Sequence, residues 1–274
     1  MSRSRAAALV AAAAVFVAFI LVSGHLPVFA FKPDVIVSTA LGVALVGVMV
    51  GAAVLGRPAP RTMLVLAGAG LACAATGSLL AVVPLADLGK IALGAGLGYW
   101  LGTSLSQLAA DLRVITVLAV LVGVLDTASV FLPQGPTNLL LTRAPQTIPY
   151  FVVAFPTIGY AVRDAYSALG TTDVLFFTLY LAAALGYGLR VRLTLAAMVA
   201  SFIATVAIAV WSRALPALPL LSAAFLAVNA DLLFKGRRPP SGGGLPESLE
   251  YIALNADLLR KGRRPPPSGG AKAP

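Results

Sequence analysis

Eight long apolar runs constrain the fold more than any other feature of this sequence. Each run has roughly the 20 residues that an α-helix needs to cross a bilayer. Hydrophobic residues make up 59% of the chain and charged residues 11%, too few charges for the surface of a soluble domain. Backbone groups in lipid must be paired within their own element, and the runs lack the alternation of barrel strands, so helices are expected. The runs lie at 6–23, 35–55, 63–83, 91–108, 114–132, 173–189, 193–211 and 216–234.

The pattern predicts an all-α fold, a polytopic transmembrane bundle of eight helices. Residues 142–170, between the fifth and sixth runs, contain Pro145, Pro149 and Pro156. This segment predicts a loop with a short re-entrant or interfacial helix, while counting residues 148–162 as a further span would give nine helices. The first run is longer than the core of a usual signal peptide, so we expect a retained helix.

Small residues recur at four-residue spacing on two of the predicted helices. They are Gly94, Gly98, Gly102 and Ser106 on the fourth, and Gly47 and Gly51 on the second. Because small side chains let helix backbones approach closely in lipid, these faces predict helix–helix contacts.

Two acidic residues lie inside apolar runs, whereas the others are expected at helix ends or in loops. Asp87 is expected at a helix end or in a loop, and Lys90 on the outer side of the membrane. Asp126 and Asp173 are the two exceptions. A charged carboxyl in the middle of a membrane helix costs about 3 kcal/mol by insertion scales, so such residues normally face the bundle interior and serve a function.

Asp126 and Asp173 are predicted to lie at similar depth. Asp126 comes about two turns before the end of its helix and Asp173 starts the next, and these helices run antiparallel if the segment between them does not span. The sequence therefore permits an aspartyl dyad, in which one carboxylate takes a proton from water and the protonated partner donates to a carbonyl oxygen. From spacing alone, a helix-capping role for each aspartate explains the pattern equally well.

Three motifs along the chain resemble those of one protein family. Leu125-Asp126 is followed by Pro-Gln-Gly-Pro at 133–136, residues 169–173 read LGTTD, and residues 213–220 read RALPALPL. In this order they resemble the Tyr-Asp helix of presenilins with its exit, the Gly-x-Gly-Asp helix, and the stretch with the Pro-Ala-Leu motif. The chain therefore resembles the presenilin and signal peptide peptidase family of intramembrane aspartyl proteases. The motifs follow the order of the family, and the resemblance covers about residues 114–233, as in a small prokaryotic member.

The resemblance implies a presenilin-like fold and an intramembrane aspartic endopeptidase that needs no metal or cofactor. Its implied substrates are membrane proteins or signal-peptide remnants. The residues it implies are Asp126 and Asp173 for catalysis, and Gly170, Thr172, Pro216, Ala217 and Leu218 for substrate binding.

The sequence also departs from the family in three respects. Leu125 stands where the family has a tyrosine, Thr172 stands where it has a glycine, and five helices instead of six include the first acid. An inactive family member that binds membrane proteins therefore stays open as an alternative.

Three regions organise the chain: N-terminal transmembrane helices as a scaffold (1–112), a catalytic transmembrane core (113–234) and a basic Pro/Gly-rich tail (235–274). The tail repeats the end of the last helix, since residues 225–243 read FLAVNADLLFKGRRPPSGG and residues 251–270 read YIALNADLLRKGRRPPPSGG. The net charge of +10 has the distribution expected for contact with anionic lipid headgroups, not nucleic acid.

Lys and Arg residues predict the orientation. With eight spans, most of them fall on one side if both termini are cytoplasmic, as the positive-inside rule requires. We therefore expect a multi-pass plasma-membrane protein whose loop between the aspartates lies outside. Signal peptide peptidase has this orientation and presenilin the opposite one, so substrates would be membrane helices with an outside C-terminus.

Composition separates the other classes of membrane protein. A metalloprotease needs His-Glu-x-x-His, but His25 is the only histidine and Glu247 the first glutamate. A proton-coupled transporter or channel could use the same two acids. That alternative explains the aspartates but not residues 213–220.

Overall fold

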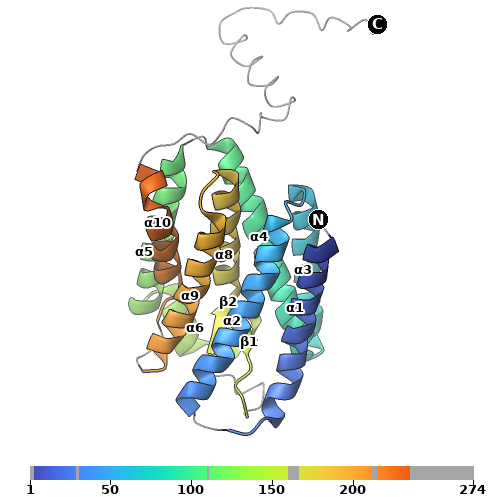
Figure 1. The fold of residues 1–274 in the computed structure, drawn as a ribbon. Coiled ribbons are helices and arrows are strands. Elements are labelled where there is room, and N and C mark those ends of the chain that lie inside the picture. The colour runs from blue at the N-terminus through green and yellow to red at the C-terminus, as the bar shows by residue number, and fades with distance from the viewer. Residues whose placement is uncertain (1–2, 29–30, 110, 160–166, 212–214, 235–274) are drawn as a thin grey trace, which may run out of the picture.

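The computed structural model describes residues 3–28, 31–109, 111–159, 167–211 and 215–234. They form a bundle of long helices that run up and down beside one another, with a two-stranded sheet within it (Figure 1). The elements are α1 (Arg3–Val22), η1 (Ser23–His25), α2 (Phe31–Leu55), α3 (Pro60–Leu79), α4 (Val83–Leu108), α5 (Leu112–Phe131), α6 (Pro136–Arg143), η2 (Pro145–Thr147), α7 (Ile148–Phe151), β1 (Val152–Phe155), β2 (Ser167–Gly170), α8 (Thr171–Gly186), α9 (Val191–Ala209) and α10 (Leu218–Phe234).

A helix lies over each of the predicted apolar runs, so the helical bundle expected from the sequence is confirmed. Five segments of the described chain are long and apolar enough to cross a membrane: Ala6–His25, Lys32–Leu55, Pro60–Leu79, Leu112–Arg143 and Val191–Ala209. Helices α8 and α10 have only 16 and 17 residues. At 1.5 Å per residue each is about 25 Å long, shorter than a typical hydrocarbon core. The predicted number of eight spans therefore stays a prediction.

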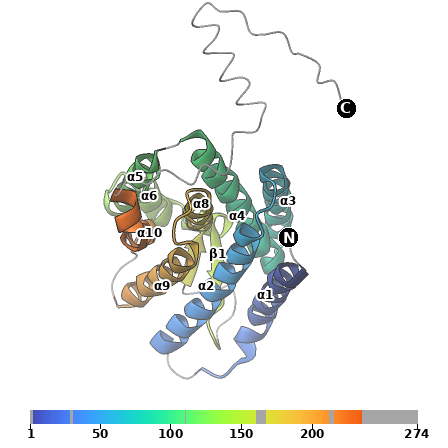
Figure 2. The same ribbon diagram turned by 45° about the horizontal axis from the view of Figure 1, so that its top comes forward.

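Helix α8 occupies the middle of the bundle, where α2, α4, α9 and α10 surround it (Figure 2). Its residues from Leu179 to Ala184 are at most 4% exposed. The predicted small face of α4 packs on it: a Cβ on Gly94 would lie 2.9 Å from the carbonyl oxygen of Thr171, and one on Gly98 would collide with that of Leu175. Helix α8 thus contacts α4 almost backbone to backbone.

The small face of α2 packs in the same way on α9. A Cβ on Gly47 would lie 2.8 Å from Val199, and one on Gly51 would lie 3.0 Å from Leu195. Both predicted small faces are therefore confirmed as contacts between helices.

The segment 142–170 differs from its prediction. Strands β1 and β2 pair antiparallel, with Val152 opposite Gly170 and Phe155 opposite Ser167. A ninth span over residues 148–162 is wrong, because α7 has four residues and a strand follows it. Proline on both sides and the β-branched and aromatic residues of β1 favour this extended conformation.

Phe155 fixes the end of β1 against the N-terminal helices. Its ring meets the ring of Phe16 edge to face, with centroids 6.5 Å apart, and it lies directly on Gly42. The hairpin is therefore part of the packed bundle and not a surface loop.

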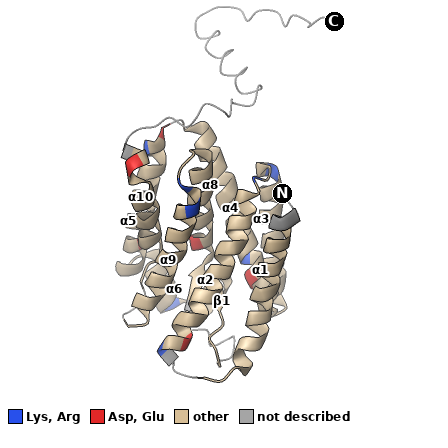
Figure 3. Cartoon of the chain, viewed as in Figure 1, with Lys and Arg blue, Asp and Glu red and all other residues tan. Residues whose placement is uncertain are grey.

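Asp87 lies near a helix end, as expected, but neither it nor Lys90 is exposed. Helix α4 begins at Val83, so both residues lie within its first two turns, and they are 1% and 5% exposed. Pro84 suits the first turn of a helix, and the two charges neutralise each other in a 2.8 Å ion pair. Figure 3 shows how few charged residues lie along the height of the bundle. Arg163, Asp164 and the tail 235–274 with its second repeat copy lie outside the described residues.

Because α4 packs closely on α8, a methyl group added to the contact face of α4 is predicted to lower stability, whereas one added elsewhere is not. Gly98→Ala should lower the free energy of unfolding by about 1–3 kcal/mol, because its methyl group would collide with α8. Gly68→Ala is the matched control on α3, where a Cβ meets nothing within 4 Å, and it should be neutral or slightly stabilising. Reversible unfolding in detergent micelles measures both, and equal effects would contradict the close packing.

Candidate active site

Asp126 lies near the C-terminal end of α5 and reaches across to the start of α10. Its Oδ2 accepts a hydrogen bond of 3.1 Å from the backbone amide of Leu218, the first residue of α10. The first amides of a helix have no partner within the helix, so a carboxylate there satisfies one of them and also meets the positive end of the helix dipole. Asp126 therefore joins α5 to the segment that resembles Pro-Ala-Leu.

Asp173 is the third residue of α8, directly after the hairpin. Its Oδ2 accepts a hydrogen bond of 2.8 Å from the amide of Gly170, the residue that precedes the helix. This is the side-chain to N-cap half of a capping box. The helix-capping alternative from the sequence thus describes a real contact of Asp173.

Both carboxyls face the same cavity, which has a volume of about 660 Å³. Helices α5 and α8 run in opposite directions, as the sequence predicts (Figure 1). Asp126 and Asp173 therefore approach the cavity from two antiparallel helices. The geometry therefore brings together two acids that are 47 residues apart in the sequence.

The other predicted site residues gather at the same cavity. Its wall includes Gly170, Thr172, Pro216 and Ala217, whereas Leu218 takes part through its amide bond to Asp126. The structure thus places six of the seven residues that the resemblance implies in the wall of one cavity, and the seventh, Leu218, binds Asp126 through its amide. Their roles in catalysis and substrate binding stay predictions.

The remaining wall is almost entirely apolar and comes from four parts of the fold. It is made by Val35 and Val43 of α2, Val130, Leu140 and Leu141 of α5 and α6, Phe151, Phe155 and Leu169 of α7 and the hairpin, and Phe202, Val206 and Ala209 of α9. Thr137 and Thr205 add hydroxyl groups. An apolar cavity with a few convergent polar groups is typical of a binding site.

Leu125 lies next to Asp126 on α5 but outside the cavity wall. It is 57% exposed and does not line the cavity, so its side chain points toward the surroundings of the bundle. Thr172, by contrast, is exposed and lies in the cavity wall. Of the two altered motif positions, only the second contacts the space between the acids.

The turn after Asp126 brings α6 under the cavity. Pro136 begins α6, the hydroxyl groups of Ser129 and Thr137 lie 2.7 Å apart, and the Asn138 amide donates to the Val130 carbonyl at 3.0 Å. The Pro-Gln-Gly-Pro exit at 133–136 therefore forms a tight turn that adds Thr137 to the wall.

Sequence reasoning missed two features beside the cavity: the hairpin and the buried pair of Asp87 and Lys90. The spacing Asp-x-x-Lys was available as a signal, because residues three apart on a helix are neighbours. Among the described residues, no group of three His, Cys, Asp or Glu side chains could hold a metal ion.

No family model, curated protein or solved structure matches this chain.

The cavity predicts different access to water at two neighbouring sites. In a Cys73→Ala background, the Thr172→Cys thiol should react with a membrane-impermeant maleimide, because water in the cavity allows the thiolate to form. The Leu125→Cys thiol, on the outer face of α5, should stay unlabelled in intact membranes. Mass spectrometry of the labelled protein measures both, and preferential labelling at position 125 would contradict a water-accessible cavity.

Proposed function

We propose that this protein is an intramembrane aspartyl endopeptidase of the presenilin and signal peptide peptidase type. The observation that carries the proposal is that Asp126 and Asp173, from two different helices, line one cavity together with Pro216 and Ala217. The segment that resembles the Pro-Ala-Leu motif contacts Asp126, because the amide of Leu218 donates a hydrogen bond to its carboxyl. Three motifs that lie far apart in the sequence therefore meet at one place, as a shared active site requires.

The chemistry follows from two carboxyls that share a site. Two carboxylates that share one site repel each other, so a catalytic pair of this kind holds one proton while the other carboxyl is ionised. The carboxylate takes a proton from a water molecule as its oxygen attacks the scissile carbonyl carbon, and the protonated partner donates to the carbonyl oxygen. Collapse of the tetrahedral intermediate breaks the C–N bond, and a proton returned to the nitrogen releases the amine.

The cavity suits an unwound piece of a membrane helix. Its apolar wall can receive side chains from a lipid-embedded segment, while hydrolysis requires a peptide bond freed from helical hydrogen bonding. Extended residues Ala168, Leu169 and Gly170 of β2 line the cavity next to Asp173. An exposed strand edge recognises extended peptides through main-chain hydrogen bonds, so it supports this substrate class.

We further propose eight membrane spans, with residues 1–112 as a scaffold and both termini in the cytoplasm. The start of α1 and the end of α10 lie at the same end of the bundle, and the turn between α5 and α6 lies at the other (Figure 1). Helices α8 and α10 complete their passes with the non-helical segments that precede them. Substrates would then be membrane proteins or signal-peptide remnants with an outside C-terminus, and the basic tail would contact anionic lipid headgroups.

Loss of either acid should abolish cleavage. Asp126→Asn and Asp173→Asn keep the size and an acceptor oxygen but remove the shared proton, so each should lower kcat/KM by about 100- to 10,000-fold. Cleavage of a labelled helical peptide by the purified protein in lipid nanodiscs measures this loss. Asp231→Asn, near the C-terminal end of α10, is the matched control.

Cleavage that survives either substitution would contradict the dyad. If the parent protein cleaves no helical substrate but carries a proton flux that needs both acids, the transporter alternative is favoured. If it does neither and still binds membrane helices, it is an inactive binder.

A topology reporter tests the orientation. An alkaline phosphatase fused after Arg143 should be active, because the segment between the acids is proposed to lie outside, whereas a fusion after Phe234 should be inactive. Phosphatase assays in cells measure both fusions, and the reverse pattern would contradict the orientation without touching the dyad.

A further inference from the structure

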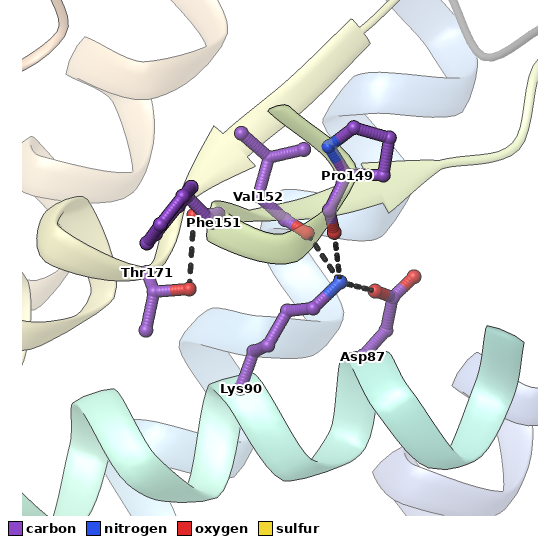
Figure 4. A network of polar contacts seen from close by, with 6 residues as sticks. All are labelled: Asp87, Lys90, Pro149, Phe151, Val152 and Thr171. Carbon is purple, nitrogen blue, oxygen red and sulfur yellow. Dashed lines mark hydrogen bonds and ion pairs between the residues drawn. The ribbon is translucent and has the colours of Figure 1, made fainter. Parts of the chain in front are cut away.

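The buried ammonium group of Lys90 is fully occupied by the hairpin and by Asp87. It donates to the carbonyl oxygens of Pro149 and Val152, both at 2.7 Å, and to Oδ1 of Asp87 at 2.8 Å. Figure 4 shows Lys90 reaching from α4 to these three acceptors. An ammonium group has three protons, so each proton has a partner. Lys90 is therefore an anchor and not a free charge.

The anchor acts on the outer edge of β1. Val152 lies opposite Gly170, but its carbonyl accepts from Lys90 and the Gly170 amide donates to Asp173, so these two groups point away from the ladder. Along an antiparallel ladder, pairs of this kind, which exchange no hydrogen bonds, alternate with hydrogen-bonded pairs. The backbone groups of Ala154, two residues after Val152, are therefore also expected to point away from β2. The amide of Ala154 does lie toward the Asp87 carboxylate.

Asp87 and Lys90 together replace a neighbouring strand. Lys90 supplies donors for an edge carbonyl, and Asp87 offers a carboxylate whose Oδ2 has no hydrogen-bond partner of good geometry within the described residues. An uncovered edge in an apolar bundle would leave its backbone groups unsatisfied. The pair covers the edge of β1, and β2 is left to face the cavity with Ala168 and Gly170.

A second contact transmits this anchoring to the catalytic helix. The hydroxyl group of Thr171, the first residue of α8, donates to the carbonyl oxygen of Phe151 at 3.0 Å (Figure 4). Residues 149–152 are thus held from α4 on one side and from α8 on the other. The hairpin also ends at Gly170, whose amide holds the carboxyl of Asp173.

We propose that Asp87 and Lys90 are positioning residues that fix the hairpin and, through Gly170 and Thr171, the carboxyl of Asp173. This inference rests on the proposed proteolysis for its consequence in activity, but its structural part can be tested alone. Lys90 and Asp87 do not line the cavity that holds the acids, so they act through the hairpin and not on the substrate.

The test uses the double variant Asp87→Leu/Lys90→Met. Removing one partner leaves an unpaired buried charge and endangers folding, whereas replacing both with apolar residues of similar size is often neutral for stability. The double variant should therefore fold and be more stable than either single variant, but it should unfold at a lower denaturant concentration than the parent, because the carbonyls of Pro149 and Val152 lose their donor. Hydrogen exchange of peptides that cover β1 and β2 should become about tenfold faster or more, because the hairpin opens locally.

Activity on a labelled helical peptide provides the second measurement. A displaced Asp173 should lower kcat by about 10- to 100-fold, as small shifts of reacting groups do, and leave KM nearly unchanged. Asp231→Asn, which removes the exposed 2.7 Å ion pair with Arg190 at the end of α10, is the control and should change neither exchange in the hairpin nor kcat.

Parent-like exchange of the hairpin in a folded double variant would overturn the proposal, whatever the protein catalyses. Faster exchange with an unchanged kcat would overturn the link to Asp173. If the parent protein cleaves no helical substrate, the proposed function has failed, and the exchange measurement by itself still decides whether the pair fixes the hairpin.

Discussion

A break in a helix inside an apolar bundle leaves amides and carbonyls without their helical partners, and the structure around the cavity depends on how they are satisfied. Polar side chains supply the partners at each break. Lys90 donates to the carbonyls of Pro149, before β1, and Val152, within it. Thr171 donates to the carbonyl of Phe151, just before β1, and Ser38 accepts from the amide of Ile158, after β1. The two aspartates accept the amides of Gly170 and Leu218. The cavity exists because the helices are interrupted there, so the polar residues that permit the interruption and those that face the cavity form one system.

The capping and catalytic explanations of the aspartates are therefore compatible. In each carboxyl, Oδ2 accepts an amide at the start of a helix, Leu218 for Asp126 and Gly170 for Asp173. These bonds fix the carboxyls relative to two rigid helices, and reacting groups held in this way need no further ordering in the transition state. A carboxylate in an apolar bundle also needs such donors, because it would otherwise lack the solvation that water provides. The same contact thus lowers the cost of placing each acid there and fixes its position in the cavity wall.

The long helices, the small faces and the two exceptional acids were predictable because each depends on local composition or spacing. A run of twenty apolar residues is stable in lipid as a helix. Gly98 and Gly102 are four residues apart, so they lie on one face of that helix wherever it begins and ends. The hairpin was not predictable in this way, since the four residues of β1 are too few for periodicity and gain their stability from Phe16, Gly42 and Lys90. The burial of Lys90 was missed for a related reason. A charged residue suggests an exposed position when it is judged singly, and only its partner Asp87 and the carbonyls of a distant segment make its burial favourable.

The two departures from the presenilin-like motifs have different physical meanings. Leu125 points away from the cavity and is 57% exposed on the outer face of α5, where an apolar side chain suits lipid better than a phenol does. Its lack of a hydroxyl group therefore removes nothing from the space between the acids. Thr172 lies in the cavity wall beside Asp173, with a branched side chain and a hydroxyl group where glycine would leave the backbone open. Thr172 therefore narrows the part of the cavity beside Asp173, where a glycine would leave more room. The proposed chemistry is compatible with both residues, and only the second lies where the proposed substrate would bind.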